Sequence, residues 1–327
     1  MDTSSRIFVA GHKGMIGSAV MRRLAKDGYQ NLLVREKAVL DLTDAYAVNR
    51  FFTEEKPNYV ILAAGRSGGI VENKRIPADF LYINLSISLN VLNATHNYGI
   101  NKLIFLGSSC MYPSNCQQPM TEDMLLSGKP EETSLGTAIS KLAGMQLCLA
   151  YNRQYGETRF IPVIPNNAYG PHDNFNPSTG HVLSVLIHRL HEAKHTGTKT
   201  VELWGSGNPR REFIHADDIA SACVMILNKE VEAQNLPMNI GVGQDISIRE
   251  LAEMIASIVG FTGNIIWNTE KPDGTSRKLL ESSRIRGLGW TPAVSLEAGI
   301  RDTYQWYLDN MTGDEAATHT IRARGNA

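Results

Sequence analysis

The sequence has little of several things that mark specialised proteins. It contains only four cysteines (Cys110, Cys116, Cys148 and Cys223), and no two of them form a C-x-x-C pair. Isolated cysteines fit free thiols in a reducing compartment, not a disulfide framework or a zinc site, so we predict no metal. No apolar run approaches the roughly 18 residues of a membrane span, and residues 1–6 are too polar for a signal peptide. We therefore expect a cytoplasmic protein without a membrane partner.

An excess of charge of either sign is also missing. Lysine and arginine total 32 and aspartate and glutamate total 33, for a formal net charge of −1. Proteins that bind nucleic acid usually carry a basic excess or a basic run, and this chain has neither, so we expect no nucleic acid partner. What the chain does have is 43% hydrophobic residues over 327 positions, enough to bury a large core and to form two lobes.

A glycine-rich turn near the N-terminus is the strongest local signal. An apolar run at 7–10 breaks into glycines three residues apart, and a helix-period pattern follows up to Leu24. Strand, tight turn and helix N-terminus suit a pyrophosphate, because glycines let backbone N–H groups approach it and the helix dipole favours negative charge. The alternative is a tight turn that holds no ligand. The predicted cofactor contacts here are Gly11, Lys13, Gly14, Met15, Ile16 and Gly17.

Short apolar segments then alternate with segments of helical length. Strands are predicted at 31–35, 59–64 and 103–107. Such alternation implies right-handed crossovers and a parallel sheet whose ligands lie beyond the carboxyl ends of the strands. Ala63 and Ala64 end one strand with small side chains, which let a cofactor pass close by. The predicted fold class is α/β: a Rossmann doubly wound parallel sheet with a smaller C-terminal α/β substrate lobe.

The end of the second predicted strand favours NADP over NAD. Folds that select NAD usually place an acid there for the ribose hydroxyls, whereas an arginine suits a 2′-phosphate. Arg35 occupies this place. The alternative for Arg35 is a solvated charge at a strand end, since Glu36 follows it directly. Asp41 and Leu42 begin a loop and helix cap that we predict to lie near the adenine.

Motifs further along the chain resemble one branch of a known family. Ser108-Ser109-Cys110-Met111-Tyr112-Pro113 follows the strand at 103–107, and Lys141 lies in the next helix. Together with the glycine turn they look like the extended short-chain dehydrogenase/reductase family. Similarity to its GDP-L-fucose synthase branch, the GDP-4-keto-6-deoxy-mannose 3,5-epimerase/4-reductases, extends over about residues 6–309. Its further motifs lie at 174–183, 204–207, 211–218 and 271–275.

The resemblance implies an organisation as well as a reaction. It implies an NADP-binding domain of residues 1–166 plus about 214–243, and a nucleotide-sugar-binding domain of about 167–213 plus 244–311. Residues 312–327 are polar and aperiodic, so we predict a flexible tail. The implied cofactor is NADP(H), and the implied substrate is a GDP-linked 4-keto-6-deoxy sugar. The implied assembly is a homodimer formed through a four-helix bundle of the helices at 83–98 and 138–155.

Epimerisation beside a ketone needs an acid and a base. A ketone at C4 of a hexose acidifies the protons on C3 and C5, and inversion removes a proton from one face and returns one to the other. The resemblance assigns this pair to Cys110 and His181. A thiol has an ordinary pKa near 8.5 and an imidazole one near 6.5, so both can exchange protons. The alternatives are a small buried hydrophobe for Cys110 and a helix-capping residue for His181.

Reduction at C4 needs a separate proton donor. In the family a tyrosine four residues before the lysine is this donor, and a serine polarises the carbonyl. Ser108 and Lys141 match, but position 137 is threonine. Loss of a general acid typically costs about 10²–10⁴-fold in rate. Three readings stay open: an epimerase with reduction impaired or lost, a bifunctional enzyme that reduces with water or Ser140 carrying the proton, and a non-catalytic homologue that binds NADP and nucleotide sugar.

Several residues are assigned to the ligands by the resemblance alone. Trp204 and Arg211 match positions that contact the nucleotide diphosphate, which suits an arginine fork and an indole face. The alternatives are a buried anchor for Trp204 and a surface ion pair for Arg211, with Arg210 as competitor. Asn166 and His181 are also assigned to the cofactor, with Asn167 able to reach either ligand. The predicted substrate contacts are Ser109, Asn167, Val182, Arg189, Trp204, Arg211 and Lys271.

Helix signals complete the C-terminal part. We predict that Asp217 caps a helix that returns the chain to the cofactor lobe. Ser247 and Glu250 form the pattern of a capping box at the head of an amphipathic helix through Ile258. A last helix is predicted to end at Leu308.

Overall fold

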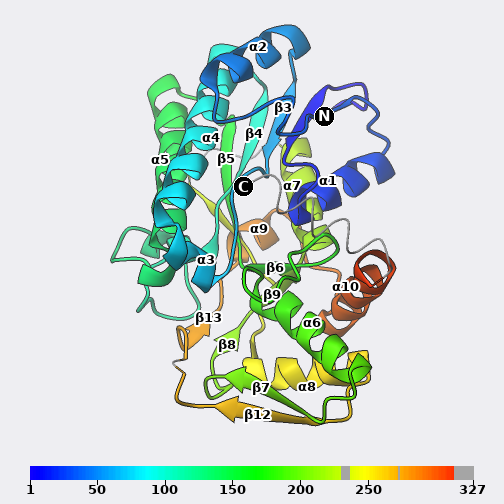
Figure 1. The fold of residues 1–327 in the computed structure, drawn as a ribbon. Coiled ribbons are helices and arrows are strands. Elements are labelled where there is room, and N and C mark those ends of the chain that lie inside the picture. The colour runs from blue at the N-terminus through cyan, green and yellow to red at the C-terminus, as the bar shows by residue number, and fades with distance from the viewer. Residues whose placement is uncertain (230–235, 272, 313–327) are drawn as a thin grey trace.

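The computed structural model describes residues 1–229, 236–271 and 273–312. It has two unequal lobes, a large sheet with its helices above a smaller α/β region (Figure 1). Within the described residues, six parallel strands form the large sheet in the order β10-β5-β4-β3-β1-β2. This is the doubly wound sheet that the sequence predicts. Its strands are β1 (Ile7–Ala10), β2 (Leu32–Leu33), β3 (Tyr59–Leu62), β4 (Lys102–Leu106), β5 (Phe160–Pro165) and β10 (Met238–Ile240).

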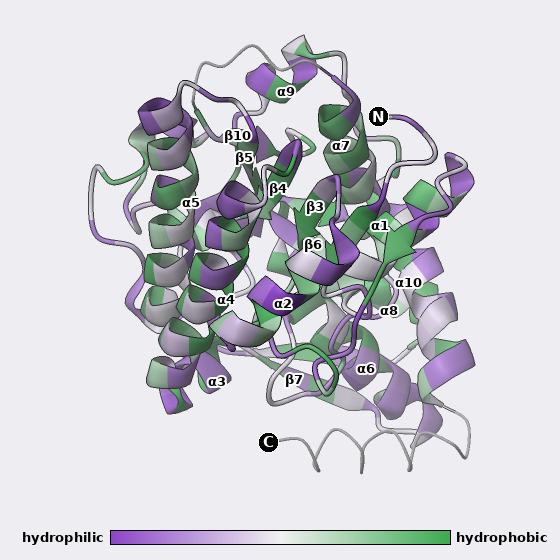
Figure 2. Ribbon diagram, turned by 90° about the horizontal axis from the view of Figure 1, so that it is seen from above, coloured by the Kyte–Doolittle hydropathy of each residue, from purple (hydrophilic) through white to green (hydrophobic). Residues whose placement is uncertain are grey.

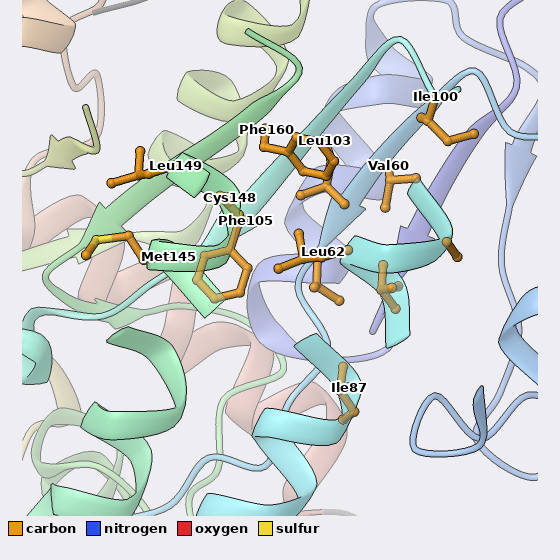
Figure 3. Close-up of a cluster of buried hydrophobic side chains, with 14 of the residues drawn as sticks. Val60, Leu62, Ile87, Ile100, Leu103, Phe105, Met145, Cys148, Leu149 and Phe160 are labelled. Carbon is orange, nitrogen blue, oxygen red and sulfur yellow. The ribbon is translucent and has the colours of Figure 1, made fainter. Parts of the chain in front are cut away.

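Alternate residues of each strand face opposite sides of the sheet, so helices cover both. Phe8, Leu62 and Phe105 point into one core and Ile7 and Ile61 into the other. Figure 3 shows the first core, where Phe105 of β4 lies beside Met145 and Cys148. Its helices are α2 (Ala45–Glu55), α4 (Pro77–Asn97) and α5 (Leu135–Tyr155), and those of the other core are α1 (Met15–Lys26) and α7 (Ala216–Asn228).

The smaller region has a core of its own, built from three helices and short strands. Its helices are α6 (Val182–His195), α8 (Ile248–Val259) and α10 (Leu296–Met311). Its strands are β6 (Asn167–Tyr169), β7 (Thr200–Trp204), β8 (Arg210–Arg211), β9 (Phe213–His215), β11 (Ile246–Ser247), β12 (Asn264–Asn268) and β13 (Arg277–Lys278). Two further short helices are α3 (Ile70–Arg75) and α9 (Ser283–Gly287). Viewed from above and coloured by hydropathy, the strands at the centre are mostly hydrophobic (Figure 2).

Local predictions met three outcomes. The capping box is confirmed: Ser247 accepts from Glu250 N and Glu250 accepts from Ser247 N. The strand predicted at 31–35 is too long, because only Leu32 and Leu33 pair with β1 and the chain then leaves the sheet edge. The prediction that Asp217 caps α7 is wrong. The cap is His215, whose side chain accepts from Asp217 N, while the Asp217 carboxylate pairs with Arg22.

Residues 285–307 contribute to both the core behind the large sheet and the smaller core. Ile285 and Trp290 pack in the core behind the large sheet, although the predicted boundaries assign them to the substrate domain, and Ile300 packs in the smaller core. The predicted tail at 312–327 lies, apart from Thr312, outside the described residues. Across those described, no helix combines the length and the apolar character that crossing a bilayer requires.

Candidate active site

The turn between β1 and α1 is shaped so that only glycine fits at two positions. Gly11 has φ +84°, and a Cβ on it would lie 2.7 Å from Ala64 N. A Cβ on Gly17 would lie 2.0 Å from the Gly11 carbonyl oxygen. Gly14 caps α1 without a side chain, and the first turn of the helix carries no acid. The first amides of α1 therefore face an open, positively polarised cradle, and these residues fit a dinucleotide pyrophosphate.

The charged residues predicted near this cradle are already paired. Lys13 lies 2.5 Å from Glu36, and both side chains are exposed. Arg35 binds Glu55, which also accepts from Arg6 at 2.6 Å. A 2′-phosphate could replace Glu55 as the partner of Arg35 at little cost, because an exposed ion pair contributes little to stability.

The loop beyond β2 is held by its own side chains. Asp41 accepts from the backbone and hydroxyl of Thr43, and these hydrogen bonds lower its pKa. The helix cap itself is Asp44, which accepts from Tyr46 N and Ala47 N. The Leu42 carbonyl oxygen accepts a hydrogen bond from the side-chain amide of Asn90 in α4. The cap expected in this loop is thus present, and it is Asp44 that supplies it.

Cys110 lies in a 3-10 turn directly after β4. Ser108 caps this turn, and its hydroxyl accepts from the Cys110 backbone at 3.4 Å. Burial raises the pKa of the Cys110 thiol, while a hydrogen bond from Ser108 and the charges of Lys278 and Lys141 lower it. The residue as a whole is only partly buried, which the alternative of a purely buried hydrophobe did not expect. Its thiol carries a proton and feels the charges of two lysines.

Lys141 of α5 lies at the same carboxyl end of β4. Helix α5 lies close over β4, because a Cβ on Gly144 would meet the Phe105 ring at 2.5 Å. One turn earlier, Lys141 Nζ donates to the Leu106 carbonyl oxygen at 2.8 Å and lies 5.2 Å from the centre of the Phe105 ring. Desolvation lowers the pKa of Lys141 to about 8. The ammonium group can therefore exchange a proton near neutral pH.

Thr137 lies in the first turn of α5, one turn before Lys141. Its hydroxyl donates to Asn73 Oδ1 at 2.7 Å. Ser140, the hydroxyl suggested as a substitute donor, is fully buried and donates to the Thr137 carbonyl. Tyr112 donates to Asn239 at 2.7 Å, and its pKa is raised mainly by burial. Among the described residues, no tyrosine hydroxyl contacts Lys141.

A loop of the large lobe runs from Lys141 to the segment that precedes His181. Gly65, directly after β3 and its two alanines, lies beside Lys141, because a Cβ on it would be 3.8 Å from Nζ. Four residues on, Gly69 N donates to the Thr179 carbonyl at 2.7 Å. His181 follows as the exposed N-cap residue of α6. The loop at 65–69 thus links the surroundings of Lys141 to the start of α6.

Asp173 is a partly buried acid beside the start of α6. It accepts from the Ser184 hydroxyl and from Asn174 N. Burial raises its pKa, and the charge of His181 is among the effects that lower it. His181 is therefore both a helix cap and the neighbour of a carboxylate.

The far end of the site carries exposed cationic and aromatic groups. The Trp204 side chain is 60% exposed, so the buried-anchor alternative is wrong, and Lys271 Nζ lies 5.6 Å from the centre of its ring. Arg210 pairs with Asp245 at 2.6 Å. Arg211 donates to the Arg210 carbonyl, and partial burial lowers its pKa. Of the two arginines, Arg211 is thus the one whose guanidinium has no carboxylate within ion-pair distance among the described residues.

Some predicted ligand contacts are used within the protein. Asn166 is buried and donates to Glu212 at 2.6 Å, and Asn167 donates to the Glu212 carbonyl at 2.7 Å. Arg189 makes a long bond to the Glu202 carbonyl. Val182 is the exposed first residue of α6. The two asparagine amides hold the join between the lobes, so neither presents a free donor to a ligand.

Four residues of the site were missed by sequence reasoning: Asn73, Glu131, Asp173 and Lys278. Glu131 accepts from Thr275 and from Lys278 at 3.1 Å, and these residues line a small cavity beside Ser109. No spacing rule connects such distant positions. Asp173 lies directly before the motif at 174–183 and Lys278 lies three residues after the motif at 271–275, and that was the only signal available.

Comparisons with known proteins identify the family. The profile of the NAD dependent epimerase/dehydratase family matches residues 7–241. GDP-L-fucose synthase 1 of Arabidopsis thaliana is 49% identical over 95% of each chain, and GDP-L-fucose synthase of Escherichia coli is 49% identical over 94% of this chain and 98% of its own. A solved GDP-mannoheptose C4 reductase from Campylobacter jejuni, with NADP bound, superimposes with a TM-score of 0.86 at 38% identity, over 94% and 99% of the two chains. The chain belongs to the NAD dependent epimerase/dehydratase family of extended short-chain dehydrogenases/reductases, in its GDP-L-fucose synthase branch.

Proposed function

We propose that the chain is a bifunctional enzyme that epimerises a GDP-linked 4-keto-6-deoxy-hexose and then reduces its C4 ketone with NADPH. The observation that supports this proposal is the path of the loop at 65–69, which begins beside Lys141, whose charge acts on Cys110, and ends on the Thr179 carbonyl, two residues before His181. The relatives named as fucose synthases favour a hexose, and the neighbour named as a mannoheptose reductase makes a heptose the second candidate. Both candidates share the ketone chemistry.

Epimerisation is the work of Cys110 and His181. The enolate formed when C3 or C5 loses a proton is delocalised onto the C4 oxygen, so a weak base suffices. Cys110 is neutral at rest because burial raises its pKa, and the charges of Lys278 and Lys141 stabilise the thiolate. His181, exposed at the N-cap of α6, exchanges the second proton. Each inversion puts one proton on the base and takes one from the acid, so solvent must remove the first and replace the second before the pair is back in its starting state.

NADP(H) is the cofactor, and the cradle at Gly11 and Gly17 fits it. The first amides of α1 hold its pyrophosphate, while Arg35 gives up Glu55 to bind the 2′-phosphate. When bound, the cofactor supplies the hydride that C4 accepts. Lys141, whose ammonium keeps further donors besides the one on the Leu106 carbonyl, would hold the nicotinamide ribose.

Lys141 is the proton source for the C4 oxygen. Position 137, where the family has its tyrosine, carries a threonine whose hydrogen is committed to Asn73, and the Ser140 hydroxyl is committed to a carbonyl. The Lys141 ammonium spends one N–H on Leu106, and its pKa of about 8 allows it to release a proton at neutral pH. The oxygen gains that proton as the carbon gains its hydride, and solvent reprotonates the amine.

A second candidate is an epimerase that has lost reduction. The bond from Thr137 to Asn73 supports it, because no hydroxyl then stands in for the tyrosine. The names of the relatives support retained reduction instead. A third candidate, a binding homologue without activity, has little support, because Cys110, Lys141 and His181 are all present.

One experiment separates the three. A GDP-4-keto-6-deoxy sugar is incubated in D₂O with the protein and NADPH, while deuterium at C3 and C5 and the absorbance of NADPH are followed. We expect both deuterium entry and NADPH loss. Deuterium entry without NADPH loss would mean that the protein is an epimerase only. The absence of both signals would contradict both activities for this sugar.

The assembly is a homodimer through α4 and α5. These two helices pack on one another. They also expose apolar side chains to solvent, which is unfavourable in a monomer: Leu81, Tyr82, Leu89, Ile139 and Tyr155. Pairing the two helices with those of a second copy would bury this surface. Light scattering on the purified protein tests it, and Leu89→Glu should shift the mass toward the monomer.

A further inference from the structure

A chain of hydrogen bonds runs from α5 to the start of α6, across the join between the lobes. Thr137 Oγ1 donates to Asn73 Oδ1 at 2.7 Å. The Asn73 amide nitrogen donates to the Gly68 and Gly69 carbonyl oxygens at 2.8 and 3.1 Å. Gly69 N then donates to the Thr179 carbonyl at 2.7 Å. Two residues after Thr179 the chain reaches His181.

The bonds leave Asn73 with one possible orientation. Its amide nitrogen faces two carbonyl oxygens, which can only accept, so the amide oxygen must face Thr137. Asn73 is buried, and without a donor from position 137 that oxygen would have no partner. A hydroxyl on Thr137 is therefore what completes the hydrogen bonding of Asn73.

The loop that Asn73 holds has little freedom elsewhere. Arg66 N donates to Asn84 Oδ1 at 2.7 Å, and the Asn84 amide donates back to the Arg66 carbonyl at 3.0 Å. Gly69 approaches the next lobe so closely that a Cβ on it would lie 2.6 Å from the Gly180 carbonyl oxygen. A shift of the loop would therefore move residues 179 and 180, and with them the residue that caps α6.

We propose that Thr137 is a positioning residue, which acts through Asn73 and the Gly69–Thr179 bond to hold His181 in place over the sugar. The inference rests on the proposed role of His181 and adds a function for position 137. In this chain the position has no part in giving a proton to the C4 oxygen. It fixes the geometry between the two lobes instead. The separation of the two tasks assigns proton supply to Lys141 and alignment to Thr137.

The test compares Thr137→Val, which keeps the shape and removes the hydroxyl, with Thr137→Ser, which keeps the hydroxyl. Amide hydrogen exchange in the ligand-free protein reports the bridge directly. In Thr137→Val we expect the Gly69 amide, and the Val185 amide that donates to the His181 carbonyl, to exchange about tenfold faster, since a buried acceptor has lost its donor. Thr137→Ser should stay within about twofold of the wild type. Thr53→Val, the same change in α2 where the hydroxyl donates to the Asn49 carbonyl, is the matched control.

Deuterium entry at C3 and C5 reports the consequence for His181. We expect Thr137→Val to lower kcat for deuterium entry about tenfold with KM unchanged, and Thr137→Ser to restore it. Asn73→Ala should give a similar loss, and the double variant no more than the larger single loss, since both break one bridge. Unchanged amide exchange, additive losses, or faster amide exchange with unchanged kcat would each overturn the inference. His181→Asn is measured alongside: if it leaves deuterium entry unchanged, the proposed function of His181 fails, separately from the bridge.

Discussion

The two ends of the site are built in opposite ways. The pyrophosphate cradle comes from one stretch of chain, β1, its turn and α1, and its donors are backbone amides. The proposed reacting end would come from β4, α5, the loop at 65–69 and the start of α6, and its groups are side chains. A local motif can bind a cofactor with little help from the rest of the fold. The reacting end exists only when two lobes are held in register.

The comparison predicts that the reacting end can be broken without damage to the cradle. Replacing Cys110 with alanine removes the thiol that exchanges a proton, so deuterium entry should fall by about 10²–10⁴-fold. NADPH binding, measured by fluorescence titration, should stay within about twofold. A Cys110→Ala protein that still incorporates deuterium at the wild-type rate would rule out the assigned pair.

Lys141 belongs to both ends, and its replacement separates them. Lys141→Arg keeps the positive charge but does not release a proton at neutral pH, so NADPH consumption should fall about 10²-fold while deuterium entry continues. In the wild type, the ammonium loses its proton as the pH rises through its pKa of about 8. The reduction rate should therefore decline above pH 8. A rate that stays level from pH 7 to 9.5 would contradict Lys141 as the proton source.

The cradle can be broken in turn, and two glycines there should respond differently. A Cβ on Gly17 would lie 2.0 Å from the Gly11 oxygen, so Gly17→Ala must distort the turn, and we expect NADPH affinity to fall more than about tenfold. A Cβ on Gly14 would lie 3.4 Å from the same oxygen, an ordinary contact. Gly14→Ala is thus the matched control, with a smaller loss. Equal losses in the two variants would mean that close packing is not what limits the cradle.

The two arginines considered for the nucleotide diphosphate offer a sharper comparison. Arg211 has no carboxylate partner among the described residues, whereas Arg210 pairs with Asp245 and Glu250. We expect Arg211→Met to raise KM for the GDP-sugar about tenfold, by loss of a charge-assisted contact to phosphate. Arg210→Met should leave KM nearly unchanged. The reverse result would exchange the roles of the two side chains.

The smallest expected effect concerns α6, which carries His181 at its start. His188 and His191 hydrogen-bond Tyr307 and Tyr304 of α10, and burial lowers the pKa of both imidazoles. The unfolded chain therefore takes up protons at a higher pH than the folded one, and stability should fall as the pH drops through about 6.5. Urea unfolding at pH 7.5 and 5.5 measures this. His188→Gln should reduce the difference, by an amount on the order of 1 kcal/mol or less.

The features that could be predicted from the sequence are mostly local, and those that could not depend on distant residues. The glycine turn and the capping box at Ser247 were predictable because each depends on neighbours within a few residues. The parallel sheet was predictable because its strands alternate with helical segments along the chain. The length of β2 was not, since it ends where an edge strand runs out of partners. The cap of α7 was assigned to Asp217, yet His215 makes it, because the acid finds an ion-pair partner in Arg22.

The reacting end was only partly predictable. Cys110, Lys141 and Thr137 could be named from their motifs, but the use of the Thr137 hydroxyl depends on Asn73, 64 residues earlier. The amides of Asn166 and Asn167 were predicted to face ligands and instead bind Glu212. The choice between Arg210 and Arg211 depended on Asp245, which no pattern around the arginines announces.

The exposed indole of Trp204 gives the protein a built-in optical reporter. Trp290 is buried, whereas Trp204 projects into solvent with a lysine amine above its ring. Its emission should therefore lie toward longer wavelengths, and a purine base that stacks on the ring would quench it. The arrival of the nucleotide could then be timed in a stopped-flow instrument, before any bond to carbon is made or broken, without attaching a dye.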